Sequence, residues 1–331
     1  MGGLVLGGVG GLLGRGHGFR GSGYTREAEA PPSRPRAPAH PVRTASAAGL
    51  ARLSGSPGFR EILAPMGGGD PRTRPGNYAV QARTYDRTRG ASPTVVRAVA
   101  KYLGPADGRN LLDIAGGTGN YARVFHARGF RVLVLDASID MLASVPGKVG
   151  PGRAMAGDAE RLPIRDSSID CAIMVNAVHL LEDPATALTE SRRILGKGPL
   201  VLTAFTRENL APLFLFEYFG LPDEIERRPE VAELQELLRR AGFSEVRHDR
   251  YVYTDTVDGS LNALHINANY LAGPAYLRNT SFWYRLDEET RRKGLDRLAE
   301  DLRSGALAQR VKESYALAAE HGHGTVFAVW P

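Results

Sequence analysis

The residues with the clearest chemical potential lie in LLDIAGGTGNYA, residues 111–122, where a glycine-rich loop follows an apolar run. Gly116, Gly117 and Gly119 let a ligand approach the backbone, and the start of the following helix offers free N–H groups. Asp113 ends the apolar run and faces the same loop. Its carboxylate repels a pyrophosphate but attracts a cationic amino-acid or sulfonium group. The loop therefore predicts a site for a cationic ligand, with a dinucleotide as the alternative.

Two further aspartates follow later strand-like runs. Asp136 ends RVLVLD, 17 residues after Gly119, where a carboxylate is placed to accept hydrogen bonds from both ribose hydroxyls. Its alternative role is to cap the next helix, for which Ser138 is the better candidate. Asp158 lies in GDAERLP, where it is able to accept from an adenine amino group. Taken alone, Asp158 is typical of a turn. Because it follows Asp113 and Asp136 in the order expected of ligand-binding acids, ligand binding is favoured.

Alternating strand and helix patterns must position these residues. Apolar runs and helical periodicities alternate from residue 92 to residue 205, which predicts a parallel sheet covered on both faces. The predicted strands are 110–115, 131–136, 152–157, 169–176, 199–205, 243–254 and 324–330; the predicted helices are 92–103, 119–128, 138–145, 184–195 and one opened by Pro229. The prediction is a doubly wound α/β fold with a mostly parallel, seven-stranded, Rossmann-like sheet. A mostly helical insert, 256–320, precedes the last strand.

Composition limits the other classes of protein. The 331 residues are 43% hydrophobic and 24% charged, as in soluble globular proteins. Residues 1–65 carry eight Arg and three Glu, or +5 of the net +6, so the charge gives little support to a nucleic-acid partner. The single Cys171 excludes a disulfide framework and a thiolate zinc site. The sequence contains no run of 18 apolar residues, so no membrane-spanning helix is predicted.

The chain divides into a tail and one domain. Residues 1–65 hold 14 Gly and 7 Pro without a helix or strand period, so we expect a disordered Gly/Pro/Arg-rich tail. An upstream start codon, with Met66 opening the functional chain, explains this tail better than a signal peptide does. The expected domain is 66–331, with a core at 78–205, substrate and lid segments at 206–320 and a last strand at 324–330.

Four ordered segments resemble the class I S-adenosylmethionine-dependent methyltransferases, in particular the small-molecule group called methyltransferase type 11. They are LLDIAGGTGNYA, LVLDASIDML, GDAERLPIRDSSIDCAIMVNAVHLLEDPATALTESRRIL and PLVLT. The resemblance is strong over 78–205 and loose over 206–331. It implies S-adenosylmethionine as cofactor, with its methionine part on the first loop, its ribose on the second-strand acid and its adenine beside the third-strand acid. The implied cofactor residues are Asp113, Ala115, Gly116, Gly117, Gly119, Asp136, Ala137, Asp158, Ala159 and Asn176. Ala115 departs from the glycine usual in the family.

The segment NYAVQARTYDRTRGASP also resembles the family's lead-in, which closes over the cofactor. Tyr85 is implied to cover the methionine end, and Arg89 to pair with its carboxylate, which a guanidinium suits. The alternative for Arg89 is a solvated arginine in an arginine-rich stretch.

The methyl acceptor is expected where segments leave the carboxyl ends of the strands. Residues 205–284 contain 13 of the 25 aromatic residues, which either pack between insert and sheet or form an apolar lid over the acceptor. Positioning alone is able to drive methyl transfer, and a base is needed only if the acceptor loses a proton. His179 is the best-placed candidate base, with local packing as its alternative; Glu217, Tyr218 and His265 are lesser candidates.

The resulting hypothesis is a cytoplasmic S-adenosylmethionine-dependent methyltransferase that acts on a small organic acceptor, for example one of secondary metabolism. We expect no metal, nucleic-acid or membrane partner, and the oligomeric state stays open. Asn176-Ala177-Val178-His179 is not the Asn/Asp-Pro-Pro-aromatic motif of enzymes that methylate base amines. The alternatives are a nicotinamide-dependent oxidoreductase that uses the glycine loop and a non-catalytic SAM-binding regulatory protein.

Overall fold

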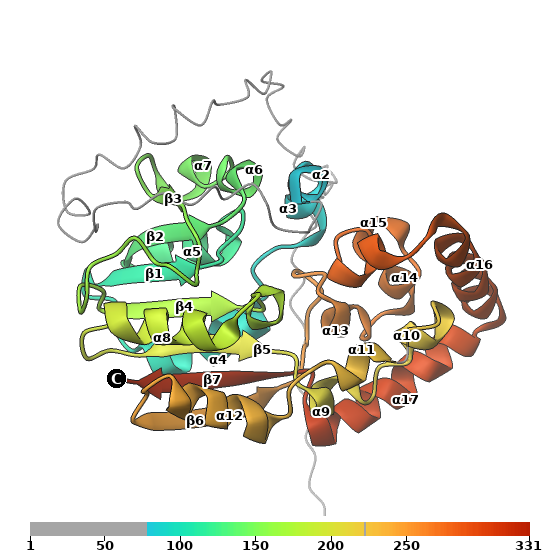
Figure 1. Ribbon diagram of the computed structural model, residues 1–331. Coiled ribbons are helices and arrows are strands. Elements are labelled where there is room, and N and C mark those ends of the chain that lie inside the picture. Colours follow the sequence, from blue (N-terminus) through green and yellow to red (C-terminus); the bar gives the residue numbers. More distant parts are fainter. Residues whose placement is uncertain (1–77, 222) are drawn as a thin grey trace, which may run out of the picture. The chain divides into compact units, whose positions relative to one another are not determined.

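A single seven-stranded sheet organises the computed structural model, which describes residues 78–221 and 223–331. The strand order is β3-β2-β1-β4-β5-β7-β6 (Figure 1). The strands are β1 (Asn110–Ile114), β2 (Arg131–Asp136), β3 (Ala154–Ala156), β4 (Cys171–Val175), β5 (Leu200–Ala204), β6 (Glu245–Tyr251) and β7 (Gly324–Trp330). The first five run parallel, while β7 is antiparallel to both β5 and β6. The predicted mostly parallel α/β sheet is confirmed. The predicted tail, 1–65, and Met66 lie outside the described residues.

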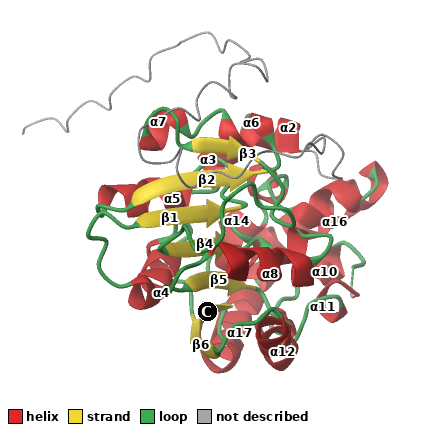
Figure 2. Cartoon of the chain, turned by 60° about the vertical axis from the view of Figure 1, so that its left-hand side comes forward, coloured by secondary structure: helices red, strands yellow, loops and turns green. Residues whose placement is uncertain are grey.

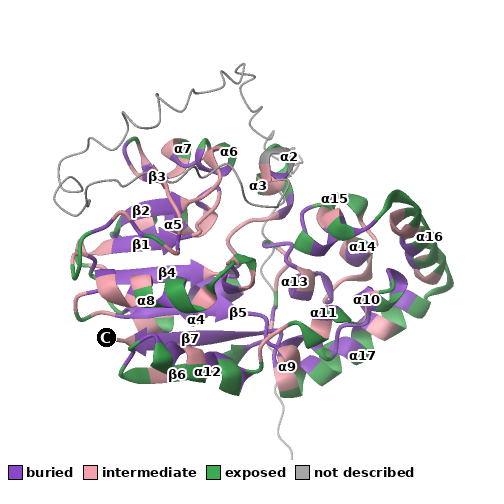
Figure 3. Ribbon diagram, viewed as in Figure 1, coloured by how far each residue is buried: buried purple, intermediate pink, exposed green. Residues whose placement is uncertain are grey.

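The sheet is buried on both faces, which explains why its strands read as continuous apolar runs. Figure 3 shows its central strands as the most continuously buried part of the fold. Neighbouring residues of a strand point to opposite faces, so Leu111 and Leu112 join two different hydrophobic clusters. Helices α4 (Pro93–Leu103) and α5 (Asn120–Ala127) cover one face, and α8 (Pro184–Ile194) and α12 (Val231–Arg240) cover the other (Figure 2).

Local capping sets the ends of these helices. Ser92 Oγ accepts from the N–H groups of Thr94 and Val95 at the start of α4, and Asp183 caps α8. The helix predicted at 138–145 is shorter in the structure, where α6 spans Ile139–Leu142; Pro146 then opens a separate helix, α7 (Pro146–Val149). The helix predicted from Pro229 begins at Val231 after a capping box at Glu230.

A helical lobe lies beside the carboxyl ends of the parallel strands (Figure 1). Its helices come from two separate segments, one before α12 and one between β6 and β7. They are α9 (Arg207–Leu210), α10 (Leu215–Tyr218), α11 (Asp223–Glu226), α13 (Leu261–Leu264), α14 (Ala268–Leu271), α15 (Pro274–Leu277), η3 (Ser281–Arg285), α16 (Glu288–Ser304) and α17 (Ala306–His321). Contacts of α10 with α16 and of α9 with α17 join the two segments. The predicted helical insert before the last strand is confirmed.

Candidate active site

The glycine loop between β1 and α5 adopts a backbone that small residues favour. Gly117 and Gly119 have φ values of +56° and +77°, and Ala115 has +53°, in the left-handed region that is unfavourable for residues with a Cβ. A Cβ on Gly116 would lie 2.6 Å from Cγ of Asp113, whereas a Cβ on Gly117 would meet nothing within 4 Å. Gly116 is therefore required by the aspartate beneath it, and Gly117 borders open space.

A hollow of about 540 Å³ lies over this loop. It is lined by residues of the loop, of the end of β4 and of the lead-in to α4: Tyr85, Arg89, Gly90, Asp113, Ala115, Gly116, Gly117, Thr118, Asn120, Tyr121, Val175, Asn176, Ala177, Leu180 and Asp258. We call it the loop hollow. Seven of the cofactor residues predicted from the sequence meet here: Tyr85, Arg89, Asp113, Ala115, Gly116, Gly117 and Asn176.

Asp113 provides a buried carboxylate in the wall of the loop hollow. The residue is 1% exposed, and Oδ2 has no hydrogen-bond partner among the described residues. Burial, together with the neighbouring Asp136 charge, raises the pKa of Asp113 to about 8. A cationic ligand group beside Asp113 would supply the missing partner and favour the ionised form of the carboxyl.

Asp136 joins the ends of β1 and β2. Its Oδ2 accepts from the Gly117 N–H and its Oδ1 from the Ser138 N–H, both at 2.8 Å. Ser138, not Asp136, caps α6 through its side chain, as the sequence favoured. Each carboxylate oxygen has more than one lone pair, so these bonds leave capacity for ligand hydroxyls. Asp136 is therefore linked to the loop hollow through its hydrogen bond with Gly117, which lines the hollow.

The four remaining predicted residues, Gly119, Ala137, Asp158 and Ala159, do not line the loop hollow. Asp158 Oδ1 accepts from the Glu160 N–H at 2.8 Å, and the Asp158 backbone carbonyl accepts from the Arg161 N–H within an isolated bridge. This is the turn geometry weighed as its alternative role. Ala159 is buried in a hydrophobic cluster of the sheet. Gly119 is the N-cap of α5, where a Cβ would lie 3.2 Å from Val145.

Arg89 is an ion-pair partner and not a solvated side chain. Its side chain is 14% exposed, and Nε lies 2.6 Å from Oδ1 of Asp258. One terminal N–H donates to the Asn279 carbonyl, and the guanidinium lies over the Tyr85 ring at 5.3 Å. Burial alone lowers the pKa of Arg89, but the Asp258 carboxylate raises it above its ordinary value. Arg89 is therefore held as a cation that joins the lead-in to the segments around Asp258 and Asn279.

Asp258 was not anticipated from the sequence. It also accepts from the Tyr121 hydroxyl at 2.8 Å, and its backbone pairs with Arg89 as an isolated antiparallel bridge. A Cβ on Gly259 would come within 2.4 Å of the Thr88 carbonyl, so glycine is needed for this close approach. The Asp-Gly pair at 258–259 was the only local signal, and it is typical of any turn.

A second unanticipated group ties the lead-in to the glycine loop. Asp86, in α3 (Tyr85–Thr88), accepts from Thr118 Oγ1 at 2.6 Å and from Asn120 Nδ2 at 2.9 Å. Lys148 lies 2.7 Å from Asp86 and also donates to the Thr118 carbonyl. This network holds Tyr85 and Arg89 against the loop hollow.

A second hollow, of about 660 Å³, lies between the sheet edge and the helical lobe. Its lining is Tyr78, Gln81, Tyr85, Arg89, Asn176, His179, Leu180, Phe216, Glu224, Arg228, Ser260, Leu261, Asn279, Thr280, Ser281 and Phe282. We call it the lobe hollow. It shares Tyr85, Arg89, Asn176 and Leu180 with the loop hollow, so the two hollows adjoin.

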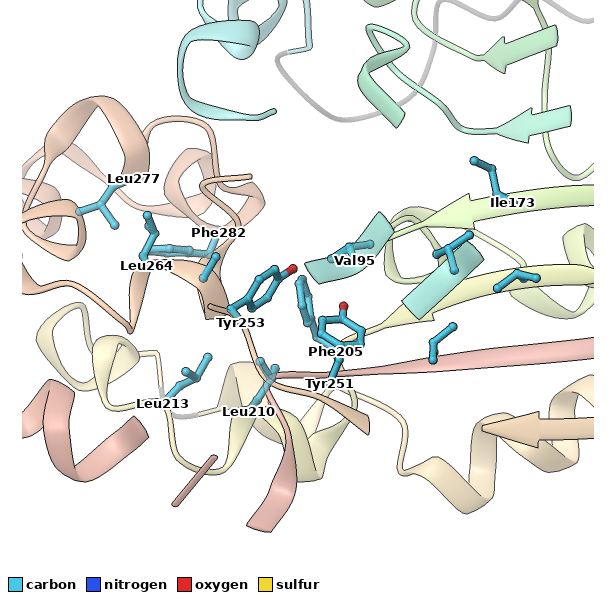
Figure 4. Close-up of a cluster of buried hydrophobic side chains, with 14 of the residues drawn as sticks. Val95, Ile173, Phe205, Leu210, Leu213, Tyr251, Tyr253, Leu264, Leu277 and Phe282 are labelled. Atoms are coloured by element: carbon cyan, nitrogen blue, oxygen red, sulfur yellow. The ribbon is translucent and has the colours of Figure 1, made fainter. Parts of the chain in front are cut away.

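The wall of the lobe hollow differs from the expected apolar lid. Of the 13 aromatic residues of 205–284, only Phe216 and Phe282 line it. Most of the others pack in the core; Figure 4 shows Phe205, Tyr251 and Tyr253 together at the junction of sheet and lobe. Packing thus explains most of these aromatic residues, and the wall of the hollow mixes Phe216, Phe282 and the two lead-in tyrosines, Tyr78 and Tyr85, with polar and charged groups.

Asn176 lines both hollows at the end of β4. It has a φ of +53° and is 8% exposed. Its Oδ1 accepts from Thr203 Oγ1 at 2.9 Å, while Nδ2 has no partner among the described residues. A buried amide N–H without a partner costs free energy, so this donor is poised for a ligand acceptor.

His179, in η2 (Val178–Leu180), lines the lobe hollow. Burial first, then the charges of Arg228, Arg89 and Arg285, lower its pKa well below the ordinary value. The imidazole is therefore neutral at pH 7: it is able to accept a proton, but it is a weak base. Glu217, Tyr218 and His265 line neither hollow. Cys171 is buried, and burial raises its pKa to about 12, as expected of a structural thiol.

Comparisons with known proteins distinguish between the three hypotheses for this chain: a methyltransferase, an oxidoreductase and a non-catalytic SAM-binding protein. The family described as a methyltransferase domain matches residues 112–203. A demethylmenaquinone methyltransferase from Streptomyces avermitilis is 30% identical over an alignment of 173 residues, which covers 45% of this chain and 74% of the relative. The chain belongs to the class I S-adenosylmethionine-dependent methyltransferases. Its cofactor is S-adenosylmethionine, so the alternatives of a nicotinamide-dependent oxidoreductase and a non-catalytic regulator are set aside.

Further relatives agree with this family. A demethylmenaquinone methyltransferase from Renibacterium salmoninarum is 28% identical over 196 residues, covering 51% of this methyltransferase and 78% of that protein. The crystal structure of a methyltransferase assigned to an antibiotic biosynthesis pathway in Anabaena variabilis has a TM-score of 0.65 at 24% identity. It covers 74% of this chain and 99% of the other, and it supports the fold.

The residues of the loop hollow fit this cofactor. The unpartnered Asp113 oxygen suits a cationic ammonium group, and the open space at Gly117 admits a ligand against the backbone. Among residues 78–221 and 223–331, no group of three or more His, Cys, Asp or Glu side chains is placed to hold a metal ion. No helix in the same ranges is both long and apolar enough to span a membrane.

Proposed function

We propose that this methyltransferase binds S-adenosylmethionine in the loop hollow and a small organic acceptor in the lobe hollow. The observation that supports this most is that the two hollows adjoin at Tyr85, Arg89, Asn176 and Leu180. Methyl transfer needs donor and acceptor in line and close together, and positioning of this kind supplies about 7–11 kcal/mol of the barrier reduction.

The cofactor residues have separate roles in this proposal. Asp113 faces the ammonium group, Gly117 gives backbone access, and Asp136 accepts from the ribose hydroxyls. Arg89 binds the cofactor carboxylate with guanidinium N–H groups not used by Asp258 and Asn279, since arginine has five donors. Asp158 and Ala159 lie toward the adenine, and Tyr85 covers the methionine end. When bound, S-adenosylmethionine supplies a methyl group activated by its sulfonium charge.

The chain's own residues shape the acceptor end. Asn176 presents its free N–H to the boundary between the hollows, and Phe216 and Phe282 provide an apolar wall. The two relatives compared above are named as demethylmenaquinone methyltransferases, and a ring-containing acceptor suits a wall with Phe216 and Phe282. His179 is the group available for an acceptor proton, although its lowered pKa makes a packing role the better assignment.

Calorimetric titration with S-adenosylmethionine, S-adenosylhomocysteine and NAD, followed by methyl-labelled S-adenosylmethionine with a metabolite extract and mass spectrometry, tests the proposal. We expect both adenosyl ligands to bind, NAD not to bind, and a labelled small molecule to form. Label found only in nucleic acid or protein would contradict the acceptor class.

A further inference from the structure

Arg228 is a largely buried cation in the wall of the lobe hollow. It follows α11 in the chain, its side chain is 12% exposed, and its Nε has no hydrogen-bond partner among the described residues. The Glu224 carboxylate is 4.0 Å from its terminal nitrogen, beyond hydrogen-bond distance. A buried charge with a buried donor left unpaired is costly unless a ligand completes it.

The nearby carboxylate is already engaged by another cation. Glu224 Oε1 lies 2.6 Å from Arg285, whose side chain is 48% exposed and does not line the hollow. One carboxylate thus faces two guanidinium groups. The other cation of the wall, Arg89, has its own partner in Asp258 at 2.6 Å. Three arginines (Arg89, Arg228 and Arg285) thus face two carboxylates (Glu224 and Asp258). The one positive charge in excess is located at Arg228, which lacks a close partner in the described part of the chain.

A second hydrogen-bond donor in the lining of the lobe hollow, the Asn176 side chain, also lacks an acceptor oxygen among the described residues. Asn176 Nδ2 is buried and unpartnered. Burial first, and then the charges of Arg228, Arg89 and Arg285, lower the pKa of His179, so this imidazole adds no positive charge to the hollow at pH 7. Phe216, Phe282 and Leu261 supply apolar surface beside these groups.

We propose that the methyl acceptor is an aromatic carboxylate whose anionic oxygens bind Arg228 and whose ring packs against Phe216 and Phe282. This inference rests on the proposed function, because it names the class of acceptor for the lobe hollow. A carboxylate offers several acceptor lone pairs and one negative charge, which match the unpaired Nε–H and the excess charge. An arginine suits a planar carboxylate better than a lysine does.

Matched acids and amides test the proposal with protein saturated with S-adenosylhomocysteine. Benzoate, 4-hydroxybenzoate and phenylacetate are titrated calorimetrically beside benzamide, 4-hydroxybenzamide and phenylacetamide, which match them in shape but lack the charge. We expect each acid to bind at least about tenfold more tightly than its amide, because only the acid pairs with the buried arginine. Arg228→Met should remove this preference, and Arg227→Met, at the exposed neighbouring position, should retain it.

A second readout is the His179 pKa, measured by NMR. It should rise in Arg228→Met, and it should rise in the wild type when benzoate is added, since both changes remove or neutralise a positive charge. Amides that bind as tightly as acids, an unchanged preference in Arg228→Met, or no acid binding up to about 10 mM would overturn the proposal. Loss of S-adenosylhomocysteine binding itself would instead count against the proposed function.

Discussion

The loop hollow and the lobe hollow are built in different ways. The loop hollow is formed mainly by short contiguous stretches at the ends of β1 and β4, where each residue is fixed by its place in a strand–turn–helix unit. The lobe hollow collects residues from the lead-in, α10, α11 and 260–282, and a long-range ion pair, Arg89 with Asp258, lies where the two hollows meet. The loop hollow is thus specified mainly by local sequence, whereas the lobe hollow depends on tertiary contacts.

The largest expected effect comes from breaking the contact between the two regions. Arg89→Met leaves the Asp258 carboxylate, 3% exposed, without its cation, and we expect the free energy of unfolding to fall by roughly 3–5 kcal/mol. Arg89→Met combined with Asp258→Asn should recover most of this stability but not S-adenosylmethionine affinity. Denaturant unfolding and calorimetry measure the two quantities.

The matched control for this pair is Arg87→Met, at an exposed position of α3. It should leave both stability and affinity close to the wild-type values. A double variant that recovers full cofactor affinity would show that Arg89 acts only within the ion pair.

Asp136→Ala should affect the cofactor side next most strongly. Removing charge-assisted bonds to two ribose hydroxyls costs about 1.5–3 kcal/mol, so we expect S-adenosylmethionine affinity to fall more than tenfold while the fold remains intact. Asp140→Ala removes an exposed carboxylate four residues away and should change neither property. Unchanged affinity in a folded Asp136→Ala protein would remove Asp136 from the site.

Asp113 should make stability depend on pH. Its pKa is about 8 in the folded protein and 3.8 ordinarily, so between these values the folded state binds a proton that the unfolded state lacks. The free energy of unfolding should therefore fall by up to about 1.4 kcal/mol per pH unit as the pH rises from about 4 to 8.

Asp113→Asn should abolish that contribution, making the variant more stable than the wild type at pH 8 while weakening its binding of S-adenosylmethionine. Chemical unfolding at several pH values, with calorimetry beside it, gives both results. Parallel stability profiles of wild type and variant between pH 4 and 8 would show that the carboxyl does not hold the proton.

His179→Gln should have the smallest effect on chemistry. A general base contributes about 10²–10⁴ in rate, but the lowered pKa of His179 favours packing, so we expect less than a tenfold loss of turnover together with a lower melting temperature. A thousandfold loss, with melting temperature and cofactor affinity unchanged, would make His179 the catalytic residue.

Most residues of the strand ends and the glycine loop that line the loop hollow could be predicted from the sequence because their signals are local. Apolar runs gave the strands, and the glycines with Asp113 gave the loop. Contacts between distant segments could not be predicted in this way: in the loop hollow, Asp258 is 169 residues from Arg89, and in the lobe hollow Arg228 lies in a charged stretch with no motif. Even within the loop, nothing local showed that Ala115 takes a φ of +53°.

The most direct test of adjoining cofactor and acceptor sites is a crystal structure of the protein with S-adenosylhomocysteine bound. We expect the ligand's ammonium group beside Asp113, its ribose hydroxyls on Asp136, and its sulfur facing Asn176 and the lobe hollow. A ligand bound elsewhere, or one in the loop hollow whose sulfur is separated from the lobe hollow by protein, would contradict the arrangement.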